Sequence, residues 1–263
     1  MFELKTEKHI EFLPGQQLSC KPRLIISDTR LLLSKATTLE DFEKETTTSV
    51  GSVEDWLHFD KTDSFGFDIE SQLLKLIYLY YPEQNKMPDN LSLFKKAERI
   101  TGIPKLQDSE DFDISPFDYR YYSINDNLLL SFGEESSSVS SLVEMRIAQD
   151  VSLFFGDGLY CAWGIYNPEL YLTDNFSAIK ARQSSEFLKG SFKSAFDLIS
   201  IENIDRMDEK DDAILNQIAI LNNEIVEHKE YADNEGLSII QKWLYDIADR
   251  FYSESDLQGL FKK

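Results

Sequence analysis

Short apolar runs separated by polar turns dominate the first two thirds of the chain. Residues 23–33, RLIISDTRLLL, contain two β-rich runs around Ser27-Asp28, and residues 65–83, FGFDIESQLLKLIYLYYPE, contain two more around Glu70-Ser71-Gln72. Residues 119–132, YRYYSINDNLLLSF, repeat the pattern around an Asn-Asp-Asn turn. Runs of this length, bounded by turn-forming residues, are typical of paired strands. We therefore expect strand, turn and strand at each place, with Pro82 ending the second pair.

A glycine-rich turn joins two further β-rich segments. VEMRIAQDVSLFF at 143–155 precedes Gly156-Asp157-Gly158, and LYCAWGIY at 159–166 follows it. Glycine adopts positive φ without a Cβ clash, and Asp is well suited to the exposed tip of a hairpin, so Asp157 is expected to serve a tight turn. The dinucleotide-binding glycine fingerprint fails, because its sixth position is Cys161 and a strand signal follows the glycines.

Two segments in this part of the chain depart from the β pattern. Residues 89–101 predict a helix, with Asp89 or Asn90 as N-cap and Gly102 as the stop. Residues 37–52, TTLEDFEKETTTSVGS, have no sustained apolar face, and we expect them to be partly loop.

From about residue 184 the apolar period becomes that of helices. Residues 184–200 predict a helix that Ser184 or Ser185 caps and Gly190 weakens. Residues 208–230 and 237–251 each carry an apolar seam with spacings of three and four. The seams are Ile214, Ile218, Leu221, Ile225 and His228, and then Leu237, Ile240, Leu244, Ile247 and Phe251. Two such helices with a short link predict an antiparallel hairpin that packs on the β region or pairs with another chain.

These patterns predict an α+β protein, with a mainly antiparallel sheet in the first two thirds and a C-terminal helical hairpin packed on it. A length of 263 residues allows one or two domains. We expect a mostly β region over 1–175 and a helical region over 176–263, integrated into one domain. The sequence leaves the oligomeric state open.

Charge is the strongest compositional signal. The chain has 27 Lys and Arg against 47 Asp and Glu, a net charge of −20. Residues 39–70 carry 2 − 10 = −8, and residues 200–263 carry 7 − 15 = −8. A chain this negative repels nucleic acid and anionic membranes and attracts basic proteins. We therefore expect a protein partner, a basic one, and no direct binding to nucleic acid or membrane.

The N-terminus, MFELKTEKHIEFLPG, has no apolar stretch typical of a secretory signal, so a soluble cytoplasmic protein is expected. Cys20 and Cys161 stand in unrelated contexts and support neither a disulfide framework nor a zinc site. The three histidines are His9, His58 and His228, and no two of them stand at metal-ligand spacing. No cofactor or metal is expected.

Catalytic motifs are absent from the sequence, so an enzyme is the less favoured interpretation. The alternative is a site assembled around His58, Asp60 and the Asp157 turn, because His58 and Asp60 would share one face of a strand. Asp60 would then orient the imidazole of His58.

Two acidic clusters remain as candidate partner-binding residues. The first consists of Asp205, Asp208, Glu209, Asp211 and Asp212, at the predicted start of the long helix. The second consists of Glu40, Asp41 and Glu43 and leads to Trp56, which is either a core residue or an exposed anchor. Our leading hypothesis is a non-enzymatic inhibitor of the immunity or antitoxin type, which neutralises a basic bacterial toxin through an acidic surface. A DNA-mimic inhibitor is a further alternative.

Overall fold

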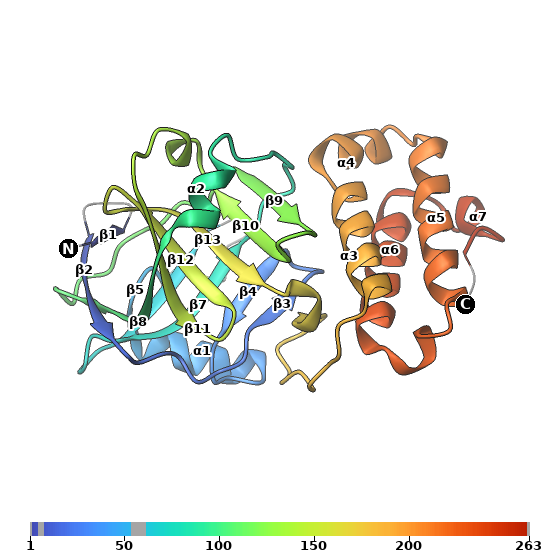
Figure 1. Cartoon of the computed structure of the whole chain (residues 1–263). Helices are drawn as coiled ribbons and strands as arrows, with labels where there is room; N and C mark the ends of the chain where they lie inside the picture. Colours follow the sequence, from blue (N-terminus) through green and yellow to red (C-terminus); the bar gives the residue numbers. More distant parts are fainter. Residues whose placement is uncertain (1, 5–7, 54–61, 262–263) are drawn as a thin grey trace.

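A β lobe, made of all the strands, lies beside a helical lobe, made of α3 to α7 (Figure 1). The computed structural model of the protein describes residues 2–4, 8–53 and 62–261. The described strands form two mixed sheets in which antiparallel pairing predominates, and only the pairs β1–β13, β8–β11 and β3–β14 run parallel. The predicted α+β class, with its C-terminal helical hairpin, is confirmed.

Six strands of the larger, eight-stranded sheet, β1, β2, β8, β11, β12 and β13, close into a barrel. The strand order of the whole sheet is β1-β2-β8-β11-β12-β13-β10-β9, and β1 also pairs with β13. The closing contact is a hydrogen bond of 2.9 Å from the amide of Glu3 to the carbonyl of Gly158. The bounds of these strands are β1 Phe2–Leu4, β2 Lys8–Pro14, β8 Glu98–Leu106, β9 Tyr119–Ser123, β10 Leu128–Phe132, β11 Leu142–Ala148, β12 Val151–Gly156 and β13 Leu159–Tyr166.

Apolar side chains fill both faces of the central barrel strands. Leu153 and Phe155 of β12 belong to the main core, whereas Phe154 points to the outer face and packs against Phe94 of α2 (Leu91–Lys96), with ring centroids 5.2 Å apart. A strand covered on both faces needs no polar alternation, which explains the apolar run Leu153-Phe154-Phe155 in β12.

The smaller sheet has the order β14-β3-β4-β7-β6-β5. It contains the two predicted strand pairs at 23–33 and 65–83, which are confirmed as antiparallel neighbours. The bounds are β3 Arg23–Ile25, β4 Arg30–Leu33, β5 Ser49–Gly51, β6 Ser64–Asp68, β7 Leu74–Tyr80 and β14 Leu172–Thr173.

Residues 37–52, expected to be partly loop, are mostly regular structure, because they form α1 (Leu39–Thr47) and β5. The hydroxyl of Thr38 caps the helix by accepting a hydrogen bond of 3.1 Å from the amide of Asp41. One buried ring, Phe42, anchors α1 against Tyr78 and Phe176. A single anchor gives too weak an apolar period to read from the sequence.

The predicted helix over 89–101 is too long. It ends at Lys96, and β8 begins at Glu98. Gly102 lies inside that strand rather than at a helix end. In the strand, a Cβ atom on this residue would come within 2.3 Å of the Leu13 carbonyl oxygen. Pairing with β2 and β11 on either side outweighs the local helical spacing of residues 98–101.

Helices α3 to α6 pack together as the helical lobe (Figure 1). α3 (Glu186–Leu198) is capped by Ser185 as predicted, and its amide at Leu188 donates to that hydroxyl at 3.1 Å. α5 (Asp212–Glu227) and α6 (Glu235–Phe251) form the predicted hairpin. The long helix does not begin at 208, because residues 201–208 form the separate helix α4 (Ile201–Asp208). A short helix, α7 (Glu254–Leu257), follows α6.

The main apolar core runs through both lobes without interruption, from Tyr171 and Leu172 of the β lobe to Leu188 and Phe192 of α3. Polar contacts also join the lobes. Lys242 of α6 forms an ion pair with Asp174 at 2.7 Å, and the amide of Ile201 donates to the carbonyl of Glu83 at 3.0 Å. The division at residues 175/176 remains a prediction.

Candidate functional site

The first acidic cluster lies at the turn between α4 and α5. We call Asp205, Asp208, Glu209, Asp211 and Asp212 the acidic turn. Four of these side chains are exposed, and Asp211 is half-buried. Asp211 is the N-cap of α5, where its carboxylate accepts a hydrogen bond of 2.8 Å from the amide of Ala213 and pairs with Arg206 at 2.6 Å. These contacts, the amide of Ala213 first, lower the pKa of Asp211.

Helix dipoles account for only part of the acidic turn. Asp211 and Asp212 lie at the N-terminus of α5, where carboxylates stabilise a helix. Asp205 and Asp208, in contrast, lie in the last turn of α4, and Glu209 is its C-cap. Negative charge at a helix C-terminus costs about 0.3–1 kcal/mol per group at low ionic strength. Three carboxylates therefore stand where the local backbone disfavours them.

The tertiary structure adds a distant residue to the acidic turn. The hydroxyl of Tyr252 donates to the carbonyl of Asp211 at 2.8 Å, and Nζ of Lys210 donates to the carbonyl of Phe251. These contacts bring the start of α7 to the acidic turn. The pKa of the Asp256 carboxyl is lowered, mainly by hydrogen bonds from Ser253 and to a smaller extent by the positive charge of Lys210. Sequence reasoning missed Asp256, which is 44 positions beyond Asp212.

The second acidic cluster is not brought to the first. Glu40, Asp41 and Glu43 belong to α1, which lies at the bottom of the β lobe, while α4 lies at the top of the helical lobe (Figure 1). Glu40 pairs with Lys44 at 2.7 Å, and the Thr38 hydroxyl donates to Asp41 at 2.8 Å. Two of the three carboxylates thus already have partners within α1.

The residues of the enzyme alternative are only partly described. Trp56, His58 and Asp60 lie outside the described residues. Asp157 has a positive φ of 50°, as expected for a tight turn. Its carboxylate accepts hydrogen bonds from the amides and hydroxyls of Ser140 and Ser141 at 2.7–3.0 Å. The Ser140 amide leads the interactions that lower the pKa of Asp157 to about 2. This carboxylate therefore organises the turn in the described structure.

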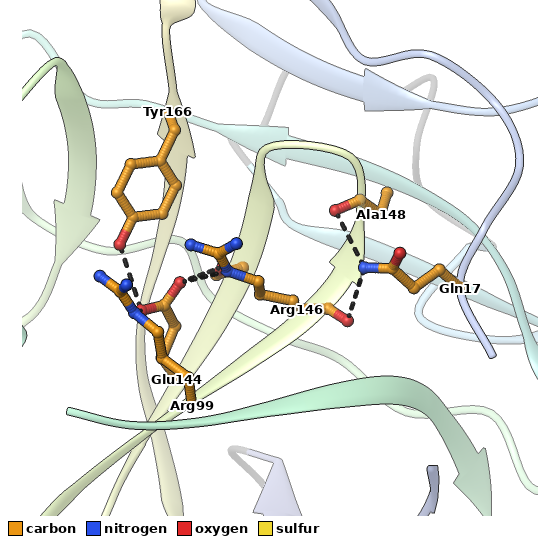
Figure 2. A network of polar contacts seen from close by, with 7 residues as sticks. Gln17, Arg99, Glu144, Arg146, Ala148 and Tyr166 are labelled. Atoms are coloured by element: carbon orange, nitrogen blue, oxygen red, sulfur yellow. Dashed lines mark hydrogen bonds and ion pairs between the residues drawn. The ribbon is translucent and has the colours of Figure 1, made fainter. Parts of the chain in front are cut away.

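A second polar site lies on the outer face of the barrel, and sequence reasoning missed it. Figure 2 shows the carboxylate of Glu144 in β11 between Arg99 of β8 and Arg146 of its own strand. The Nε atoms of the two arginines lie 2.8 Å and 3.1 Å from the carboxylate oxygens. The hydroxyls of Ser152 and Tyr166 donate to the same carboxylate at 2.9 Å and 3.1 Å. We call Glu144, Arg99 and Arg146 the arginine pair site.

No pattern in the sequence indicates the arginine pair site. Glu144 and Arg146 alternate with Val143, Met145 and Ile147, which is the ordinary pattern of a strand with one solvated face. Only the neighbouring strands bury Glu144 and bring Arg99 to it.

Within residues 2–4, 8–53 and 62–261, no group of three His, Cys, Asp or Glu side chains is arranged to hold a metal ion. Within the same described ranges, no helix is long and apolar enough to cross a membrane. In comparisons with known proteins, no family model, curated protein or solved structure matches the chain.

Proposed function

We propose that this protein acts by binding a basic protein partner through the acidic turn, as an inhibitor of the immunity or antitoxin type. The observation that carries the proposal is the position of Asp205, Asp208 and Glu209 at the C-terminal end of α4, exposed and against the helix dipole. Such charges lower the stability of the fold. Residues that lower stability are expected at functional sites, and here the function that they would serve is binding.

Electrostatics supports a basic partner. The net charge of −20 attracts a cationic protein over distances of about a Debye length, roughly 8 Å at physiological salt, and so raises the association rate. Within the acidic turn, Arg206 is already paired with Asp211 and Lys210 with a backbone carbonyl. The surrounding carboxylates therefore present net negative charge to a partner.

Affinity capture from native lysate, at low and moderate salt, tests the proposal. The variant D205N/D208N/E209Q removes the three dipole-opposed charges and brings the net charge to −20 + 3 = −17. The matched control E70Q/D113N/D118N has the same net charge but neutralises exposed carboxylates of the β lobe. We expect the wild type and the control to retain one stoichiometric basic protein, weakened by salt, and the acidic-turn variant to lose it.

Recovery of no stoichiometric partner at either salt concentration would overturn the proposal, as would equal loss in both triple variants. If duplex DNA displaces the captured protein, the partner is a DNA-binding protein, and the DNA-mimic alternative gains support.

A further inference from the structure

The arginine pair site is rigidly built into the barrel. β8 and β11 are parallel neighbours, with Arg99 in register with Glu144 and Arg146 in register with Thr101. Glu144 and Arg146, two apart on β11, share one face of the sheet, so the two guanidinium groups flank one carboxylate (Figure 2). The amide of the Gln17 side chain donates to the carbonyls of Arg146 and Ala148 at 3.3 Å and 3.4 Å and holds the end of β11.

Glu144 is the buried base of this site. Its side chain is 0% exposed, and both carboxylate oxygens accept two hydrogen bonds or ion pairs each. Burial of a charge is costly, and apolar side chains of similar volume often stabilise a protein as well as a buried ion pair does. Core stability alone therefore gives little reason for a carboxylate here. Its distinct effect is to fix two arginine side chains in place.

Both arginine side chains remain partly exposed and can contact a further ligand. Each contacts Glu144 through Nε, and their side chains are 53% and 39% exposed. The Tyr166 hydroxyl also contacts the Arg99 guanidinium, and among the described residues Arg146 donates side-chain hydrogen bonds through Nε alone. The guanidinium carbon of Arg146 also lies over the ring of Tyr166, 5.3 Å from its centroid, which restrains the guanidinium plane.

We propose that Arg99 and Arg146 bind the phosphate group of a phosphorylated ligand. A phosphate monoester carries about −1.5 to −2 charges and three terminal oxygens, so it can accept hydrogen bonds from both guanidinium groups at once. A carboxylate is the weaker candidate, because Glu144 already occupies the carboxylate position between the arginines. The three site residues sum to +1, a local positive charge that favours an anion in a chain whose net charge is −20.

Titration of the full chain with inorganic phosphate in chloride buffer, followed by calorimetry and phosphorus NMR, tests this site. We expect saturable binding with one phosphate per chain. R99Q and R146Q should each weaken binding by about tenfold, because each removes charge-assisted hydrogen bonds to the anion. The control R250Q makes the same charge change at an exposed arginine of α6 and should leave the affinity unchanged.

R99K keeps the positive charge beside Glu144 and serves if R99Q does not fold. Lysine lacks the planar fork of arginine, so we expect R99K to fold and to bind phosphate several-fold more weakly. Affinity equal to wild type in R99K, equal weakening by R250Q, or no saturable binding at tens of millimolar phosphate would overturn the proposal.

Two further probes separate the sources of the phosphate. Glycerol phosphate represents a small phosphorylated metabolite, and a phosphoserine peptide represents a modified protein. Tighter binding of one probe than of inorganic phosphate, lost in R146Q, identifies the class of ligand. Binding of both probes no tighter than inorganic phosphate would restrict the site to the free ion. This test is independent of the acidic turn, since neither Arg99 nor Arg146 belongs to that surface.

Discussion

The guanidinium carbon of Arg120 lies 3.9 Å from the centroid of the Phe196 ring, although Arg120 belongs to β9 and Phe196 to α3. The same guanidinium donates to the carbonyls of Phe196, at 2.8 Å, and of Ile199, and to the amide oxygen of Asn85, at 2.8 Å. Burial lowers the pKa of Arg120 to about 10, so the group stays charged at neutral pH. This side chain therefore fastens the C-terminus of α3 to the β lobe.

Replacement of Arg120 by Met should lower the free energy of unfolding by roughly 3 kcal/mol or more. The change removes three hydrogen bonds from a charged donor, each worth about 1.5–3 kcal/mol, and leaves two buried carbonyls without that donor. Urea unfolding followed by circular dichroism measures the change. The exposed R250M control should stay within about 0.5 kcal/mol of wild type. A loss of less than 1 kcal/mol in R120M would contradict the anchoring role.

A comparison of the wild type with R120M also tests whether the chain is one integrated domain. Because the apolar core is continuous from the β lobe into α3, the lobes should unfold in one transition. Hydrogen exchange in the wild type should then give α6 and β13 equal opening free energies. In R120M, α6 should exchange before β13. Early exchange of α6 in the wild type would instead favour two domains divided near residue 175.

Two glycines should respond to alanine in opposite directions. Gly190 lies inside α3 with no heavy atom within 4 Å of an added Cβ, so G190A should stabilise the protein by about 0.5–1 kcal/mol. At Gly102 of β8 an added Cβ would meet the Phe12 ring and the Leu13 carbonyl at 2.3 Å, so G102A should destabilise it by about 1–3 kcal/mol. Thermal unfolding of both variants measures the contrast, and equal signs would argue against the pairing of β2 with β8.

Asp157 should make stability depend on pH at the acidic end. Its folded pKa of about 2 is below the ordinary value of 3.8, so its contribution is present above pH 3.8 and is lost as pH falls toward 2. The stability difference between wild type and D157N should therefore be constant above about pH 4 and should shrink between pH 4 and 2. Asn tolerates the positive φ of 50°, which isolates the charge from the backbone. Urea titrations at each pH measure this difference, and a constant difference down to pH 2 would contradict the bonding by Ser140 and Ser141.

The dipole-opposed carboxylates should cost stability. Neutralising Asp205, Asp208 and Glu209 should raise the free energy of unfolding by about 1–3 kcal/mol at low salt, and by less at high salt. The control E70Q/D113N/D118N measures the general relief of repulsion in this acidic chain. Greater stabilisation by the acidic-turn variant than by the control supports a cost that binding offsets. A net loss of stability would assign these residues a structural role.

The elements that the sequence predicts well are those with strong local periodicity. The strand pairs at 23–33, 65–83 and 119–132 and the helices α3, α5 and α6 each bury a regular set of apolar side chains. The apolar pattern does not predict α1, because Phe42 is its one buried apolar anchor. Thr38 followed by Asp41 is nevertheless an N-terminal capping pattern. Residues 98–101 were assigned to a helix because three-residue spacing alone does not exclude a strand.

By itself, the sequence determined the α+β class, the Asp157 turn, the helical hairpin and the acidity, since local burial period, turn chemistry and charge are written in neighbouring residues. Only the tertiary structure decided the closure of the barrel at Gly158, the union of Asp256 with the acidic turn, and the arginine pair site. Arg99 and Glu144 are 45 positions apart, and their ion pair exists because two strands lie in parallel register. Such contacts depend on which strands become neighbours, and that choice is made by the packing of the whole core.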